Sequence, residues 1–169
     1  LIIGVKGGYG SSRLLNDIDY SLIKKNNSMI MGYSDLTSLL IAANNITGIP
    51  MFYGFLIIPD FNGKVFKRKI NLLKIVLNEK KIEYELPYKL IKRPSSFRNS
   101  VSVPVSIAGC LTLLSCMCGT KYFKQFEKEN VMFIEDINEE PYRIDRMLTH
   151  LKNCGVFENT KCLFIDFNK

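Results

Sequence analysis

The stretch "MIMGYSDLTSLLIAA", residues 29–43, contains the most informative local pattern in the sequence. The apolar run Met29–Met31 predicts a short buried strand, and leucine and alanine then recur at helical spacing from Leu36 to Ala43. Ser34 therefore lies on the turn between a strand and a helix. Its hydroxyl could cap the helix by accepting a hydrogen bond from a backbone N–H, or it could act as a nucleophile. The second glycine of a G-x-S-x-G nucleophile elbow is absent, so these residues alone favour the cap.

Strand and helix patterns alternate on both sides of this stretch. Short apolar strands are predicted at residues 1–5, 51–55, 130–136 and 162–167, and the uncharged run 101–120 predicts a strand, a turn and a buried helix rather than a membrane span. Alternating strands and helices are typical of α/β proteins with parallel sheets. The sequence therefore predicts an α/β fold.

The clearest predicted helix covers residues 141–154. Pro141 suits the first helical position, and the stripe Ile144, Met147, Leu148 and Leu151 has the spacing of a buried helix face. His150, the only histidine, lies on the opposite, polar face. We therefore interpret it as a solvated histidine and not as a catalytic base.

Charge is unevenly distributed along the chain. The formal net charge is +7, and residues 61–98 hold eleven Lys/Arg against three Glu, a local excess of +8. Residues 64–81 of this segment suit an amphipathic helix with a solvated lysine face; an aromatic stacking platform and a nucleic-acid-binding motif are both missing from it. We predict no nucleic-acid partner and three regions: 1–60, a basic linker with the amphipathic helix at 61–98, and 99–169.

The five cysteines favour reduced thiols in a cytosolic protein. Cys116 and Cys118 are not spaced as C-x-x-C, and no histidine is near them in the sequence, so we predict no zinc site.

Two further segments could carry chemistry. The loop "GVKGGYGSSR" lacks the third glycine of a dinucleotide fingerprint and the G-K-[ST] of a P-loop, but its glycines could present a bare N–H to an oxyanion. Glu135 and Asp136 follow the apolar strand "NVMFI", where a carboxylate could orient a histidine or pair with an arginine.

Together these motifs strongly resemble the LD-carboxypeptidase family, serine peptidases that include the microcin C immunity peptidases. The resemblance runs through essentially the whole chain in the order "GGYGSSRLL", "GYSDLTSLL", "FYG", "FIED" and "EEPYRIDRMLTHL". It implies a parallel-sheet nucleophile domain, incomplete at its N-terminus, followed by part of a second α/β domain. It also implies hydrolysis of the L,D bond to the terminal D-alanine of murein tetrapeptides in cytoplasmic peptidoglycan recycling.

The resemblance assigns roles to four residues. Ser34 matches the nucleophile, Glu135 matches the triad acid, and the backbone N–H groups of Gly8 and Asp35 match the oxyanion hole. It implies a murein peptide partner and a possible homodimer, with no metal, organic cofactor or membrane attachment.

The sequence departs from the family at several positions. The family's third triad member is a histidine downstream of anything in this sequence, and His150 does not match it, so the 169-residue chain alone is expected to be inactive. Lys6 replaces an arginine and Cys110 an asparagine, which affects the expected substrate pocket. Two alternatives stay open: a microcin-immunity-like peptidase acting on peptidyl-nucleotides, and an inactive truncated remnant.

Overall fold

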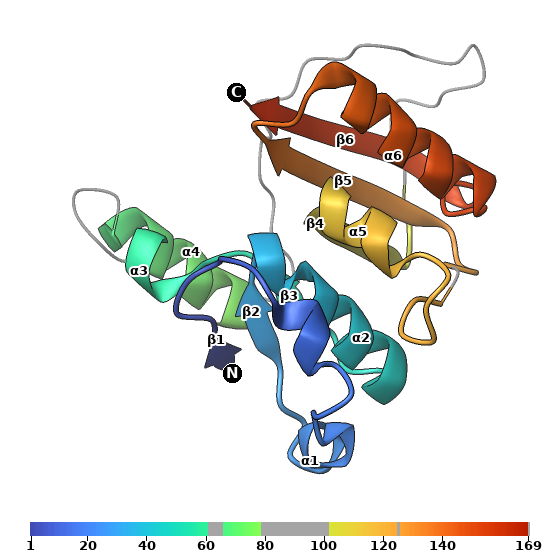
Figure 1. The fold of residues 1–169 in the computed structure, drawn as a ribbon. Helices are drawn as coiled ribbons and strands as arrows, with labels where there is room; N and C mark the ends of the chain where they lie inside the picture. Colours follow the sequence, from blue (N-terminus) through green and yellow to red (C-terminus); the bar gives the residue numbers. More distant parts are fainter. Residues whose placement is uncertain (61–65, 79–101, 125, 169) are drawn as a thin grey trace.

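The computed structural model describes residues 1–60, 66–78, 102–124 and 126–168, and strands and helices alternate through them (Figure 1). The strands are β1 (Ile2–Ile3), β2 (Ile30–Gly32), β3 (Phe52–Tyr53), β4 (Val105–Cys110), β5 (Asn130–Ile137) and β6 (Thr160–Asn168). The α-helices are α1 (Tyr20–Lys25), α2 (Thr37–Thr47), α3 (Ile57–Asp60), α4 (Phe66–Asn78), α5 (Leu111–Met117) and α6 (Pro141–Asn153). Two 3₁₀ helices complete the list: η1 (Ser11–Leu14) and η2 (Ser34–Leu36).

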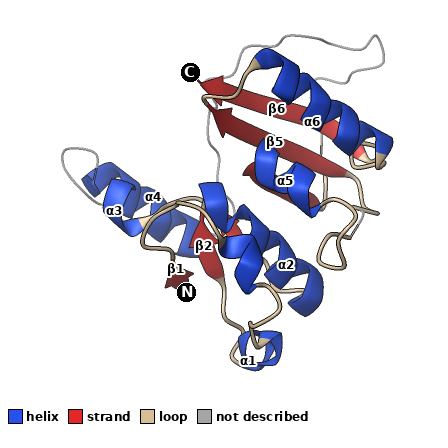
Figure 2. Ribbon diagram, viewed as in Figure 1, coloured by secondary structure: helices blue, strands red, loops and turns tan. Residues whose placement is uncertain are grey.

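The strands form two parallel three-stranded sheets, in the orders β1-β2-β3 and β4-β5-β6 (Figure 2). Parallel neighbours need a crossover connection, and α2, α5 and α6 supply three of these. In the second sheet, Glu135 on the central strand pairs with Cys110 on one side and Asp166 on the other. The α/β fold predicted from the sequence is thus confirmed.

Helix α2 packs on both sides. Leu40 and Ala43 form a small core with Ile30 of the first sheet. Ile41 and Ala42 join a larger core, whose other members include Leu15, Ile107, Leu111, Leu114, Met117, Met132, Ile134, Leu151 and Val156. A helix that is apolar all round is expected to be buried in this way. Since α2 begins just after Ser34, this packing fixes the serine turn against both sheets.

Within the uncharged run, residues 105–110 form strand β4 and residues 111–117 form helix α5, the strand and the buried helix that were expected there. None of the described helices is both long enough and apolar enough to cross a lipid bilayer. The predicted amphipathic helix corresponds to α4, and the remaining residues of the predicted span 64–81, like most of the basic linker beyond α4, lie outside the described residues. Helix α3 was not predicted, because four residues carry too little periodicity to be recognised.

Candidate active site

Ser34 begins η2, one residue after the end of β2, with a φ of +60°. A positive φ is uncommon outside glycine and is held in place by the surrounding structure. The N-cap residues are Tyr33 for η2 and Leu36 for α2, and neither helix has a side-chain cap. The interpretation of Ser34 as a helix cap is therefore wrong. The backbone instead makes a sharp strand-to-helix turn, the geometry that exposes the serine in a nucleophile elbow.

The glycine loop after β1 lies against this serine. A Cβ built on Gly7 would be 3.3 Å from the Ser34 Oγ and 3.2 Å from its Cβ, so a side chain at this position would crowd the hydroxyl. The next residue, Gly8, is exposed and has a φ of +146°, which L-amino acids rarely adopt. The glycine turn and Ser34 therefore lie on the same side of the first sheet.

Asp35 ties the glycine loop to the serine turn. Its buried carboxylate accepts hydrogen bonds from the N–H of Gly10 at 3.2 Å and of Ser11 at 2.9 Å, and the Ser11 hydroxyl donates to the Asp35 carbonyl. Among the residues that the structure describes, the N–H groups of Gly8 and Asp35 have no protein acceptor. Two backbone donors near Ser34 are thus available to a ligand.

Glu135 reaches the serine turn through Tyr53. The Tyr53 hydroxyl donates to Glu135 Oε1 at 2.5 Å and accepts a hydrogen bond from the Ser34 N–H at 3.0 Å. Burial, followed by the neighbouring Glu135, raises the pKa of Tyr53 far above its ordinary value, so the phenol keeps its proton. Burial also raises the pKa of Glu135, the hydrogen bond from Tyr53 opposes this, and Asp136 and Asp166 add to the rise.

Asp136, the other carboxylate after the apolar strand, points elsewhere. Its Oδ2 accepts hydrogen bonds from the N–H of Thr112 at 2.9 Å and from the hydroxyl of Thr112 at 2.8 Å, at the start of α5. Neighbouring residues of a strand point to opposite faces of the sheet, which explains why Glu135 and Asp136 have different partners. Of the two carboxylates, Glu135 is the one that is linked to the Ser34 turn.

Thr37 joins the serine turn to the end of β4. Its hydroxyl donates to the Ser34 carbonyl at 2.7 Å and accepts from the Cys110 N–H at 3.0 Å. Gly109 makes this approach possible, because a Cβ there would lie 2.8 Å from the Thr37 methyl group. Burial raises the pKa of the Cys110 thiol to about 12, so this thiol is neutral.

Sequence reasoning missed the bridging roles of Tyr53 and Thr37. Both are in quoted motifs, "FYG" and "GYSDLTSLL", but nothing local to either residue identifies its partner. Lys6, which stands where the family usually has an arginine, is exposed at the start of the glycine loop.

His150 lies apart from these residues. Helix α6 follows the carboxyl end of β5 and runs back along the sheet, so nine residues carry His150 about 14 Å along the helix from Pro141. No histidine is near Cys118 in the sequence, but the ends of α5 and α6 meet in the fold and bring Cys118, His150 and Cys154 together. Chain spacing does not reveal this contact.

Comparisons with known proteins agree with this arrangement. Residues 1–54 match the model of the LD-carboxypeptidase N-terminal domain, and residues 105–168 match that of the C-terminal domain. A probable murein peptide carboxypeptidase of Bacillus subtilis is 35% identical over 152 residues, which are 88% of this chain and 46% of that protein. The microcin C7 self-immunity protein MccF of Escherichia coli is 30% identical over 190 residues, covering 97% of this chain and 55% of that protein.

Solved structures include a muramoyltetrapeptide carboxypeptidase from Oxalobacter formigenes, with a TM-score of 0.74 and 27% identity. The alignment covers 99% of this chain and 57% of that structure's chain. The chain spans about half the length of the curated relatives it matches. With both domain models matched in order, and with this shared fold, the chain belongs to the LD-carboxypeptidase family of serine hydrolases.

Proposed function

We propose that the protein is a serine carboxypeptidase that hydrolyses the L,D bond to the terminal D-alanine of murein tetrapeptides, in cytoplasmic peptidoglycan recycling. The names of the Bacillus subtilis relative and of the Oxalobacter formigenes structure support a murein peptide as the substrate. In this proposal Ser34 is the nucleophile, Glu135 is the triad acid, and the N–H groups of Gly8 and Asp35 form the oxyanion hole.

The observation that carries the proposal is the setting of Ser34. Its side chain caps no helix, its φ is +60°, and the glycine loop packs against its hydroxyl. Gly8 follows Gly7, whose Cβ position is 3.3 Å from the Ser34 Oγ, and Asp35 follows Ser34 in the chain. The carboxylate of Glu135 is linked to the same turn through Tyr53. A serine placed only for packing needs neither the donors nor the carboxylate.

The chemistry follows from these positions. The Ser34 Oγ attacks the carbonyl carbon of the scissile bond, and its proton passes to a histidine. The two N–H groups donate to the oxyanion; each such donor is typically worth a factor of about 10² to 10³ in rate. Since Tyr53 binds Oε1 of Glu135, we assign Oε2 as the atom that orients the histidine.

In this proposal, the histidine that accepts the proton is not one of the 169 residues. The family resemblance assigns the base to a downstream segment, and His150 lies toward the opposite end of its sheet. A serine hydroxyl without a base is a weak nucleophile near neutral pH. We therefore expect the 169-residue chain alone to be inactive.

D-alanine release from a synthetic murein tetrapeptide tests the proposal. The 169-residue chain should release little, and a chain extended through the family's upstream and downstream segments should turn over. Ser34→Ala should abolish that turnover, whereas Ser12→Ala, at an exposed serine of η1, should not. Turnover that survives Ser34→Ala would exclude Ser34 as the nucleophile, and robust release by the short chain that survives His150→Ala would show that another residue is the base.

The second candidate substrate is a peptidyl-nucleotide, because the MccF relative matches 97% of this chain at 30% identity. Aspartyl sulfamoyl adenosine, a ligand of an MccF structure, is a suitable competing substrate. Comparing kcat/KM for the tetrapeptide and for this compound in the extended chain separates the two candidates. We expect the tetrapeptide to be preferred, since the stretch "EEPYRIDRML" favours the murein branch.

A further inference from the structure

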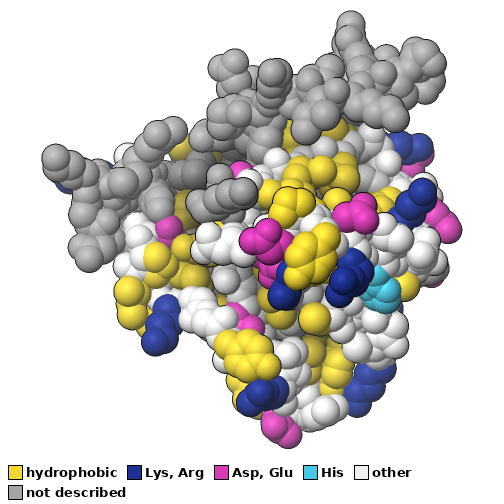
Figure 3. Space-filling view, turned by 45° about the horizontal axis from the view of Figure 1, so that its top comes forward, with side chains coloured by type: hydrophobic (Ala, Val, Ile, Leu, Met, Phe, Trp, Pro, Cys, Tyr) yellow, Lys and Arg dark blue, Asp and Glu magenta, His cyan; other side chains and the backbone are white. Residues whose placement is uncertain are grey.

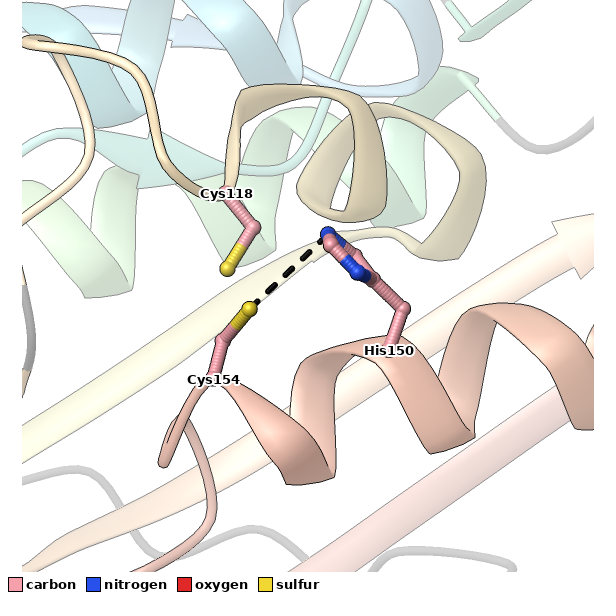
Figure 4. A group of neighbouring side chains, drawn as sticks. All are labelled: Cys118, His150 and Cys154. Atoms are coloured by element: carbon pink, nitrogen blue, oxygen red, sulfur yellow. Dashed lines mark hydrogen bonds between the residues drawn. The ribbon is translucent and has the colours of Figure 1, made fainter.

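Three metal-ligating side chains that the proposed reaction does not use meet beside the second sheet (Figure 4). Cys118 directly follows α5, His150 is in the last turn of α6, and Cys154 directly follows α6. The two sulfur atoms and an imidazole nitrogen all lie within 4.8 Å of one another, and Cys154 Sγ is 3.9 Å from His150 Nε2. Figure 4 shows the three side chains turned toward one point.

We propose that Cys118, His150 and Cys154 bind one Zn²⁺ or a similarly borderline-soft transition-metal ion. Zinc is held tetrahedrally at about 2.3 Å by sulfur and about 2.0–2.1 Å by imidazole, which separates neighbouring ligand atoms by about 3.5–3.8 Å. The Cys154–His150 edge is already close to this value. The other two pairs of ligand atoms, at no more than 4.8 Å, need to approach each other by at most about 1.3 Å.

The backbone holds the ligands in position. His150 and Cys154 are four residues apart on one helix face, and the Cys154 N–H donates to the His150 carbonyl at 3.0 Å. The Cys118 N–H donates at 3.1 Å to the carbonyl of Leu114, whose side chain is fully buried. The buried Leu151 packs in the same core as Leu114. A preformed set of ligands loses little conformational entropy when it binds an ion.

Electrostatics at this point favour a cation. Both cysteines stand at helix C-terminal ends, where the last carbonyl groups carry partial negative charge. A metal ion that binds the two thiols removes their protons, so the bound form of each cysteine is the thiolate.

The site faces solvent, since His150 is exposed and the histidine is visible on the molecular surface (Figure 3). Three protein ligands leave the fourth zinc position to water. The ligands join the ends of α5 and α6 and lie away from Ser34 and Glu135. The bound ion therefore cross-links two helices of the second sheet's layer and stabilises the fold by mass action.

Metal titration of the purified 169-residue chain, reduced and kept free of oxygen, tests this site. Zn²⁺ is added in competition with a chromogenic chelator, and Co²⁺ is added separately to detect thiolate-to-cobalt charge-transfer absorption. We expect one ion per chain and charge transfer from two thiolates. Cys118→Ser, His150→Ala and Cys154→Ser should each weaken binding by more than roughly a hundredfold, since even an outer-shell partner is commonly worth ten- to a hundredfold.

Cys116→Ser and Cys162→Ser are matched controls, because neither thiol belongs to the cluster; both should bind like the parent chain. Parent binding no tighter than that of His150→Ala would overturn the proposal. So would a Cys118–Cys154 disulfide found by mass spectrometry after rapid alkylation of the freshly isolated protein. His150 is exposed, so His150→Ala should fold, and circular dichroism without metal verifies this.

Discussion

Tyr53 and Glu135 belong to different sheets and share a hydrogen bond of 2.5 Å. The same phenol accepts the Ser34 N–H at 3.0 Å, so one oxygen atom links the backbone of the serine turn to the proposed triad acid. Hydrogen bonds in a partly buried site are stronger than in water and costly to leave unmade. Tyr53 is therefore a positioning residue for both groups.

Tyr53→Phe removes this link without changing the shape of the ring. The Ser34 N–H loses its acceptor and Glu135 loses a donor, so we expect a loss of about 1–3 kcal/mol in the free energy of unfolding. The pKa of Glu135 should rise further, because the Tyr53 hydrogen bond lowers it. NMR titration of the Glu135 carboxyl and chemical denaturation measure the two effects. Tyr20→Phe, which removes a hydroxyl bound to the Leu15 carbonyl, should leave the Glu135 titration unchanged.

Glu135 should also make stability depend on pH. Burial raises the pKa of its carboxyl in the folded state, so the unfolded chain loses this proton at lower pH than the folded protein. The contribution to stability is fully present below the unfolded pKa and is lost as pH rises through the folded pKa. Glu135→Gln removes the titration. The difference in free energy of unfolding, variant minus parent, should therefore increase as pH rises from about 4 to about 7. A difference that is constant with pH, or that shrinks, would show that burial does not dominate.

The sequence predicted those parts of the fold that depend on local periodicity. Helix α6 has a proline at its first position and a regular apolar stripe, and α5 follows an uncharged strand; both were recognised. Such patterns report which face of an element is buried, and burial decides the element type. The same reasoning put Ser34 at the start of a helix but favoured a helix cap over a nucleophile, because periodicity does not report the backbone angle on which that choice depends.

The contacts that build the candidate site join residues far apart in the chain. Tyr53 and Glu135 are 82 positions apart, and Thr37 and Cys110 are 73 apart. Periodicity carries no information on such pairs, and the family resemblance supplied only the end points Ser34 and Glu135. For the same reason, the meeting of Cys118 with the end of α6 was missed.

The variant Ser34→Gly should be more stable than the variant Ser34→Ala. At a φ of +60°, any residue with a Cβ is strained by about 1–2 kcal/mol, and glycine is not. After the larger chain entropy of unfolded glycine is subtracted, Ser34→Gly should exceed Ser34→Ala in stability by about 1 kcal/mol or less. Thermal and chemical denaturation of both variants measure this difference.

Lys24, an exposed residue within α1, gives a matched pair of control variants, for which the opposite order of stability is expected. Lys24→Gly should be about 1 kcal/mol less stable than Lys24→Ala, because glycine is the poorer helix former. If alanine were also the better residue at Ser34, the left-handed turn would not exist in solution.

Asp35→Asn should loosen the glycine loop. The carboxylate accepts two backbone hydrogen bonds, from Gly10 and Ser11, and charge-assisted bonds of this kind are about twice as strong as neutral ones. An amide retains one acceptor oxygen and adds an NH₂ group that cannot accept. Amide hydrogen exchange at Gly10 and Ser11 should accelerate, whereas Asp17→Asn, at an exposed carboxylate of the next turn, should leave both rates unchanged. Unchanged exchange in Asp35→Asn would mean that another contact holds the loop.

Thr37→Val tests the second link between the serine turn and the second sheet. Valine keeps the shape of threonine but removes the hydroxyl that donates to the Ser34 carbonyl and accepts from the Cys110 N–H. Thr37 is fully buried, so both partners lose a bond that water does not easily replace, and the free energy of unfolding should fall by about 2–4 kcal/mol. Thr37→Ser keeps the hydroxyl and removes only a methyl group, which should cost about 1 kcal/mol. Denaturant unfolding ranks the two variants; if serine proves the less stable, the methyl contact with Gly109 outweighs the hydrogen bonds in joining the two sheets.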